Sequence, residues 1–168
     1  MPTDFHTAKN ASVKWSDSGA DEVLSFASLA AGGGRNGALH DFGVMPRPTR
    51  YHITAKIAWD TAAVIGETLR IFIREAGGVD DATATNPTND DGTGDTALGA
   101  SKERNLLHVG TIVADEAAAD IPSVFEGEFV SSSRFKGPTV INDSAANILD
   151  ATATNSFITI TPIFDQAQ

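Results

Sequence analysis

Apolar and polar residues alternate over several short stretches of the chain, and this alternation predicts β-strands. Between residues 51 and 59 the larger apolar side chains fall at every second position, namely Tyr51, Ile53, Ala55, Ile57 and Trp59. A period of two is typical of a strand with one face in a core and the other in water or against a partner. Comparable patterns cover residues 66–76, 105–115, 123–131 and 155–164.

Weaker strands complete the set. Residues 22–30 are apolar enough for a buried strand that ends at Gly32, and residues 32–37 have the composition of a turn. Residues 134–143 predict only a weak strand, because Gly137 and Pro138 interrupt it. Counting gives about eight strands and no helix long enough for a βαβ unit. We therefore predict an all-β fold, an antiparallel β-sandwich or jelly roll.

The chain divides into two predicted parts. Residues 1–21 are polar and predict an N-terminal arm, and residues 22–168 predict a single β-sandwich domain with a long acidic loop at 77–104. The connector at residues 60–66 has room for a single helical turn. Across the loop we expect the apolar face of residues 66–76 to pack on that of residues 105–115, which pairs Leu69, Ile71 and Ile73 with Leu107, Val109 and Val113.

The opposite face of residues 66–76 carries Arg70, Phe72 and Arg74, and two interpretations of it are open. An exposed row of this kind is typical of a protein interface, where aromatic residues and Arg are enriched. Alternatively, carboxylates on a neighbouring strand cover the row, and Glu126 and Glu128 have the matching spacing. We favour the second interpretation, because such pairing is common on a solvated sheet face.

Composition excludes several classes of function. The 168 residues carry a formal charge of −10, and the 12 Lys and Arg residues are scattered, which argues against a nucleic-acid or anionic-membrane partner. The chain has no cysteine, so disulfides, thiol catalysis and thiolate metal sites are excluded. The first residues lack the apolar segment of a signal peptide, and no stretch has the roughly 18 apolar residues of a membrane span. We expect synthesis in a reducing cytoplasm without export by that route.

The acidic loop offers the best candidate for a metal site. Oxygen-bearing side chains alternate there with glycines, and the candidate calcium ligands are Asn89, Asp91, Thr93 and Asp95. The twelfth position from Asn89, where a calcium loop places a bidentate Glu, is Ala100. The alternative is a solvated loop of turn-forming residues. We predict no cofactor.

No constellation of residues predicts catalysis. The four histidines are widely separated, and none belongs to a metal-binding pair; they are His6, His40, His52 and His108. No G-x-S-x-G elbow is present. Glu126 and Glu128 would lie about 7 Å apart on one strand face, but glycosidases usually take their two carboxylates from different elements of a deep cleft. We predict that the protein is not an enzyme.

Three segments give the chain a resemblance to a known class of proteins. These are GETLRIFIREA, the long DGTGDTALGASKERNLLHVGTIVADEA segment and the closing SFITITPIFDQ. With them, the chain from Arg50 onward resembles small auxiliary virion proteins of tailed bacteriophages, of the decoration or cement type. The resemblance lies in overall style rather than in an invariant motif, so it transfers no functional residue.

The resemblance implies a β-sandwich or jelly roll that binds a capsid or tail surface without catalysis, usually as a homo-oligomer. We therefore expect a structural component of a phage virion, made in the host cytoplasm, that decorates or cements the capsid. Its partners would be the major capsid protein or other virion proteins. The alternative is a carbohydrate- or calcium-binding β-sandwich module, such as a receptor-binding or adhesion domain.

Overall fold

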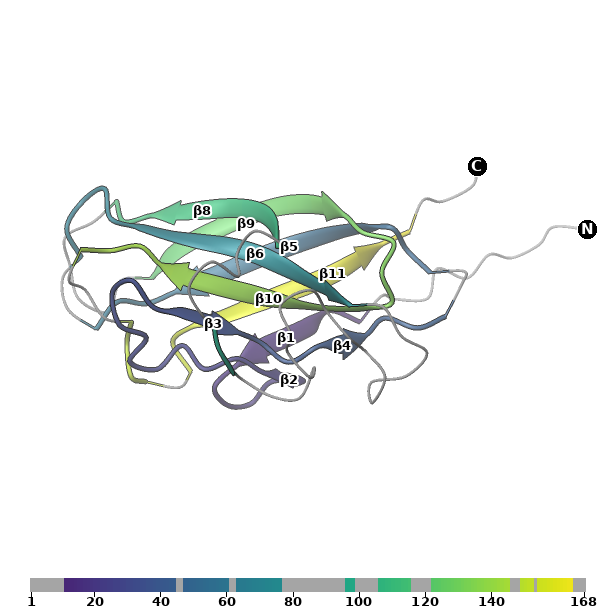
Figure 1. The fold of residues 1–168 in the computed structure, drawn as a ribbon, viewed down its shortest axis with the longest axis horizontal. Coiled ribbons are helices and arrows are strands. Elements are labelled where there is room, and N and C mark those ends of the chain that lie inside the picture. Colours follow the sequence, from purple (N-terminus) through teal and green to yellow (C-terminus); the bar gives the residue numbers. More distant parts are fainter. Residues whose placement is uncertain are drawn as a thin grey trace, which may run out of the picture.

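Two β-sheets packed face to face form the protein in the computed structural model (Figure 1). The structure describes residues 11–44, 47–60, 63–76, 96–98, 106–115, 122–145, 149–152 and 154–164. No helix occurs within these ranges. The five-stranded sheet has the order β2 (Glu22–Val23), β1 (Val13–Ser16), β11 (Phe157–Ile163), β5 (Arg50–Ile57) and β9 (Ser123–Val130).

The six-stranded sheet has the order β7 (Thr96–Ala97), β3 (Gly34–Asn36), β10 (Phe135–Asn142), β6 (Thr68–Ala76) and β8 (Leu107–Val113), and β4 (His40–Asp41) also pairs with β10. Pairing along the chain is nested. Four sets of antiparallel pairs lie one inside the next along the sequence: β1 with β11, β3 and β4 with β10, β5 with β9, and β6 with β8. A long hairpin wrapped over itself in this way is a jelly roll. The predicted all-β sandwich is confirmed, and its strand order is that of a jelly roll.

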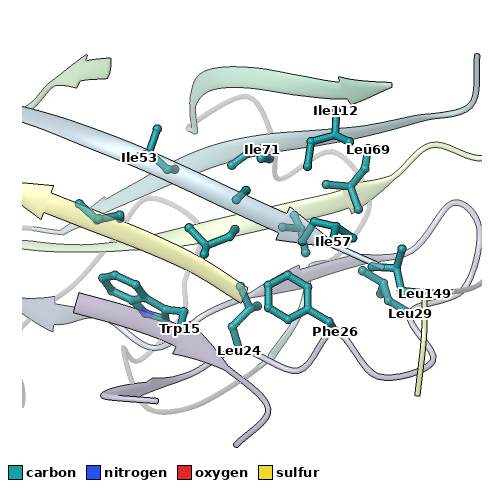
Figure 2. Packing of buried hydrophobic residues seen from close by; sticks show 14 of the residues in the cluster. Trp15, Leu24, Phe26, Leu29, Ile53, Ile57, Leu69, Ile71, Ile112 and Leu149 are labelled. Atoms are coloured by element: carbon teal, nitrogen blue, oxygen red, sulfur yellow. The ribbon is translucent and has the colours of Figure 1, made fainter. Parts of the chain in front are cut away.

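The core lies between the two sheets (Figure 2). All five residues predicted to face inward from residues 51–59 are buried, as are Leu69, Ile71 and Ile73. Below them, Trp15 packs with Leu24, Phe26 and Leu29 (Figure 2). The alternation in the sequence therefore identified the inner faces of β5 and β6 correctly.

The segment after β2 is buried without being a strand, so the strand predicted over residues 22–30 is wrong beyond Val23. The carboxylate of Asp17 accepts hydrogen bonds from the backbone N–H groups of Phe26 and Ala27, at 3.0 and 3.4 Å. Ser28 follows with a φ of 57°, which turns the chain. The Asp17 carboxylate thus accepts the backbone hydrogen bonds that a neighbouring strand would otherwise have accepted.

The predicted packing of β8 is partly wrong. Leu107 and Val113 are exposed, Val109 is partly buried, and Ile112 is the β8 side chain that enters the core. A β-bulge explains why Ile112 rather than Val113 faces inward, because Ile71 pairs with Gly110 and the next residue, Phe72, pairs with His108. The extra residue on β8 shifts its alternation by one position.

Strand β10, predicted to be weak, is buried along all eight residues and lies in the middle of its sheet. Opposite it, three residues, Gly37 to Leu39, face only two, because Asn36 pairs with Thr139 and His40 with Lys136. The carbonyl of Pro138 accepts the Gly37 N–H at 2.8 Å. The nitrogen of Pro138, which has no hydrogen to donate, points to the same side of the strand and therefore faces this bulge. Proline is tolerated in a sheet at such a position.

The predicted N-terminal arm overlaps the sandwich. Val13–Ser16 pairs with β11 as β1, and Trp15 has no exposed surface, so these residues belong to the domain rather than to an arm. Residues 1–10 lie outside the described ranges. So does the predicted acidic loop at 77–104, apart from 96–98, which include β7.

Candidate functional site

The predicted calcium ligands, Asn89, Asp91, Thr93 and Asp95, lie outside the described residues. In the described part of the chain, no three His, Cys, Asp or Glu side chains come together as a possible metal site. Two unusual environments occur in the described structure, and neither was predicted as a site from the sequence. They lie at the two ends of β5.

The Arg70, Phe72 and Arg74 row fits neither interpretation considered from the sequence. Phe72 and Arg74 are buried, so the row is not an exposed interface. Glutamates of β9 do not cover it either, because β9 belongs to the other sheet, where Glu128 pairs with Arg50 at 2.9 Å. Arg70 instead forms a two-pronged ion pair with Asp143, which follows β10.

Arg74 and Trp15 both reach the bulge between β3 and β4. Arg74 Nη2 donates to the carbonyl of Gly37 at 2.5 Å, and Trp15 Nε1 donates to the carbonyl of Ala38 at 2.8 Å. Pro138 has no N–H to offer these carbonyls, and a buried carbonyl left without a donor is costly. The two side chains therefore stabilise the bulge, and we assign Arg74 a structural role.

Next to this bulge, Lys136 places its ammonium group inside the protein. Lys136 has no exposed surface. Its Nζ donates to Tyr51 Oη at 3.0 Å and to the carbonyl of Ser133 at 2.5 Å. The same nitrogen lies 4.6 and 4.2 Å from the ring centroids of Phe42 and Tyr51, within the range of cation–π attraction. We call Lys136, Phe42 and Tyr51 the lysine cage.

Burial, the largest cause, and the nearby Arg47 guanidinium together lower the pKa of Lys136 to about 8, while Glu75 acts in the opposite direction. Burial also raises the pKa of Tyr51. The amine is therefore mostly protonated at pH 7 and acts as a hydrogen-bond donor. Since the side chain is fully enclosed, its role is structural: its two hydrogen bonds hold the turn before β10 against β5.

A chain of aromatic rings surrounds the lysine cage. His40 meets Phe42 edge-on with centroids 4.9 Å apart, and Phe42 meets Tyr51 edge-on at 5.2 Å. On the far side, Tyr51 stacks on Phe129 at 5.2 Å. These residues come from three separate parts of the sequence, so no local pattern could have grouped them.

The opposite end of β5 leads into a tight turn, Val64–Glu67, that is held from several sides. Glu67 N–H donates to the Val64 carbonyl at 3.0 Å, and Gly66 has the φ of +95° that a type II turn requires at its third residue. The Glu67 carboxylate accepts the N–H groups of Val64 and Ala145, at 3.0 and 3.1 Å. Gly66 and Glu67 also exchange backbone hydrogen bonds with Ala114. The helical turn considered for this connector is therefore wrong for residues 63–66.

This turn presents aliphatic side chains to solvent. Val64 and Ile65 are 64% and 66% exposed, and Val113, beside Ala114 at the end of β8, is 51% exposed. We call Val64, Ile65 and Val113 the apolar tip. Turn positions usually carry polar residues, so the adjacent Val64 and Ile65 before Gly66 were a usable signal in the sequence. A rigid apolar projection can bind a partner at a low cost in ordering.

Fold and surface together define a jelly-roll β-sandwich with an internal lysine cage at one end and an apolar tip at the other. No protein-family model and no curated protein sequence matches the chain. None of the described residues form a helix long and apolar enough to cross a membrane.

Proposed function

We propose that the protein is a non-enzymatic structural component of a phage virion that decorates or cements the capsid surface. Its partners would be the major capsid protein or other virion proteins, and it would act as a homo-oligomer. Jelly rolls are common among viral capsid domains, which supports a structural role. The observation that carries the proposal is the apolar tip, a docking contact fixed in place before binding.

The size of the tip suggests how such binding would work. Covering a large aliphatic side chain contributes about 1.5–3 kcal/mol when it is fully buried, and these three start half to two-thirds exposed. The cost of association offsets much of that gain, so a single tip would bind weakly. A homo-oligomer on a capsid presents several tips to a repeating surface, and multivalency then raises the affinity without new contacts.

The rival function is a carbohydrate- or calcium-binding module, since jelly rolls also occur as lectins. It makes different predictions about what the protein binds. A calcium-dependent module should melt at a higher temperature with calcium, and Asp91→Ala with Asp95→Ala should remove that shift.

Co-sedimentation with particles tests the proposal. Particles of the phage that encodes the chain should retain the protein, and particles without it should be less resistant to heat and osmotic shock. Val64→Ser with Ile65→Ser should release the protein from the particles. Val44→Ser, which changes an equally exposed valine that follows β4 and is not part of the apolar tip, is the matched control and should leave retention unchanged.

Two results would overturn the proposal. One is a protein that never sediments with particles, particularly if calcium raises its melting temperature. The other is particles whose resistance to heat and osmotic shock is the same with and without the protein.

A further inference from the structure

Strand β9 forms one edge of the five-stranded sheet. Among the described strands it pairs only with β5, over all eight of its residues. The free side of such an edge presents backbone N–H and C=O groups on which another extended chain can pair. Its length exceeds that of β2 and β7, the short strands at the opposite edges of the two sheets.

Strand β9 is anchored to the core by its inward-facing side chains. Inward from β9, Phe129 is buried and Phe125 packs against the core. The Phe125 ring lies so close to Gly110 of β8 that a Cβ at Gly110 would be 2.2 Å from it. This contact ties β9 to the edge of the other sheet, so the strand offers a fixed template rather than a frayed one.

Outward from β9, the exposed side chains form a symmetric row of Val124, Glu126, Glu128 and Val130. On its paired side, the row meets Lys56, Thr54, His52 and Arg50 of β5, in that order. Arg50 bonds diagonally to Glu128 at 2.9 Å, while the partner opposite Glu126 is the uncharged Thr54. A strand on the free side would complement this row if basic residues lay opposite both glutamates and apolar residues opposite both valines.

A second copy of β9 is the wrong occupant. Antiparallel pairing of two β9 strands about Gly127 would set Glu126 of each copy directly opposite Glu128 of the other. Like charges directly opposite each other on a sheet are destabilising. The row thus opposes self-pairing while favouring a basic strand.

We propose that β9 accepts, by β-strand addition, an extended segment of a partner protein in which two basic residues at alternate positions are flanked by apolar ones. Backbone hydrogen bonds would supply the pairing, and the two glutamates would select the partner. The inference does not depend on a virion role or on the apolar tip.

An NMR titration of the labelled full chain tests it with a capped peptide, VTKTKTV, whose alternate residues are Val, Lys, Lys and Val. We expect shifts and slowed hydrogen exchange at the amides of β9. The acidic peptide VTETETV should not bind. Glu126→Gln with Glu128→Gln should weaken binding of the basic peptide about tenfold, as expected for the loss of two cross-strand ion pairs.

A charge swap and a matched control separate pairing from general attraction to an acidic protein. Glu126→Lys with Glu128→Lys should reverse the preference toward VTETETV. Asp60→Asn with Asp115→Asn, which removes two exposed carboxylates elsewhere, should leave the affinity unchanged. The proposal is overturned if the basic peptide leaves β9 amides unperturbed, if the glutamine variant binds as tightly as wild type, or if the control variant weakens binding as much.

Discussion

The two ends of β5 differ in which kind of side chain is buried near them. At its beginning, Lys136 and the neighbouring Arg74 have no exposed surface, although both are cations. At its far end, Val64 and Ile65 are mostly exposed, although both are aliphatic. Whether a side chain is buried here depends on the partners that the fold places around it, not on its polarity alone.

Each arrangement has a physical cause. The buried cations donate hydrogen bonds to carbonyl oxygens that receive none from any described neighbouring strand, at the bulge and at the turn before β10. Buried charge of this kind is tolerated when it is hydrogen-bonded and is expensive otherwise. The exposed aliphatics contribute little to folding, because folding hardly removes them from water. This difference predicts that changes at the first end alter stability, whereas changes at the second alter binding.

The largest expected loss of stability comes from Gly137→Ala. A Cβ at this position would lie 2.4 Å from the backbone oxygen of Ala38, so the bulge itself would have to move. We expect the free energy of unfolding to fall by about 3 kcal/mol, as for other overpacked cores. As a control, Gly43→Ala adds an atom where nothing lies within 4 Å but φ is +88°, and should cost only about 1 kcal/mol. Equal losses in denaturant titrations would contradict the role of the bulge.

The same bulge could not be predicted from the sequence. The alternation in β5 and β6 predicted their inner faces, because each such pattern is local. Gly137 and Pro138 looked like an interruption, because their fit depends on Gly37 and Ala38, about a hundred residues away. A bulge shifted β8 in the same manner.

The buried cations were also beyond the reach of the sequence pattern. Arg74 lies on the outward face of β6, and solvent exposure is the ordinary expectation for such a residue. Its acceptor, the Gly37 carbonyl, is brought close to Arg74 only by the pairing of β3 and β4 with β10. The apolar tip, by contrast, could have been recognised from an aliphatic pair at a turn.

A smaller, pH-dependent effect should arise from the lysine cage. The folded protein releases the Lys136 proton near pH 8, whereas the unfolded chain keeps it until about pH 10.5. The unfolded state therefore binds more protons between these values, and the free energy of unfolding should rise by about 2 kcal/mol from pH 8 to 9.5. Above pH 10 the raised pKa of Tyr51 acts in the opposite direction.

Unfolding titrations at several pH values check this effect. Lys136→Met should flatten the rise, because it removes the titrating group. Lys56→Met, on the outer face of β5, is the control and should preserve it. The same rise in both variants would show that Lys136 is not its source.

The smallest effect on stability is expected at the apolar tip. Val64→Ser with Ile65→Ser should change the free energy of unfolding by no more than about 0.5 kcal/mol, since both side chains are already mostly exposed. Thermal unfolding measures this directly. A loss above about 2 kcal/mol would mean that the tip belongs to the folding core, and the contrast between the two ends of β5 would fail.

Measuring particle retention and unfolding on the same samples tests the division between the two ends most directly. We predict that Val64→Ser with Ile65→Ser retains wild-type stability but no longer sediments with particles. Gly137→Ala should lose stability yet still sediment at temperatures where it remains folded. The contrary result, in which the tip variant binds normally or Gly137→Ala abolishes binding while folded, would contradict the assignment of binding to the tip.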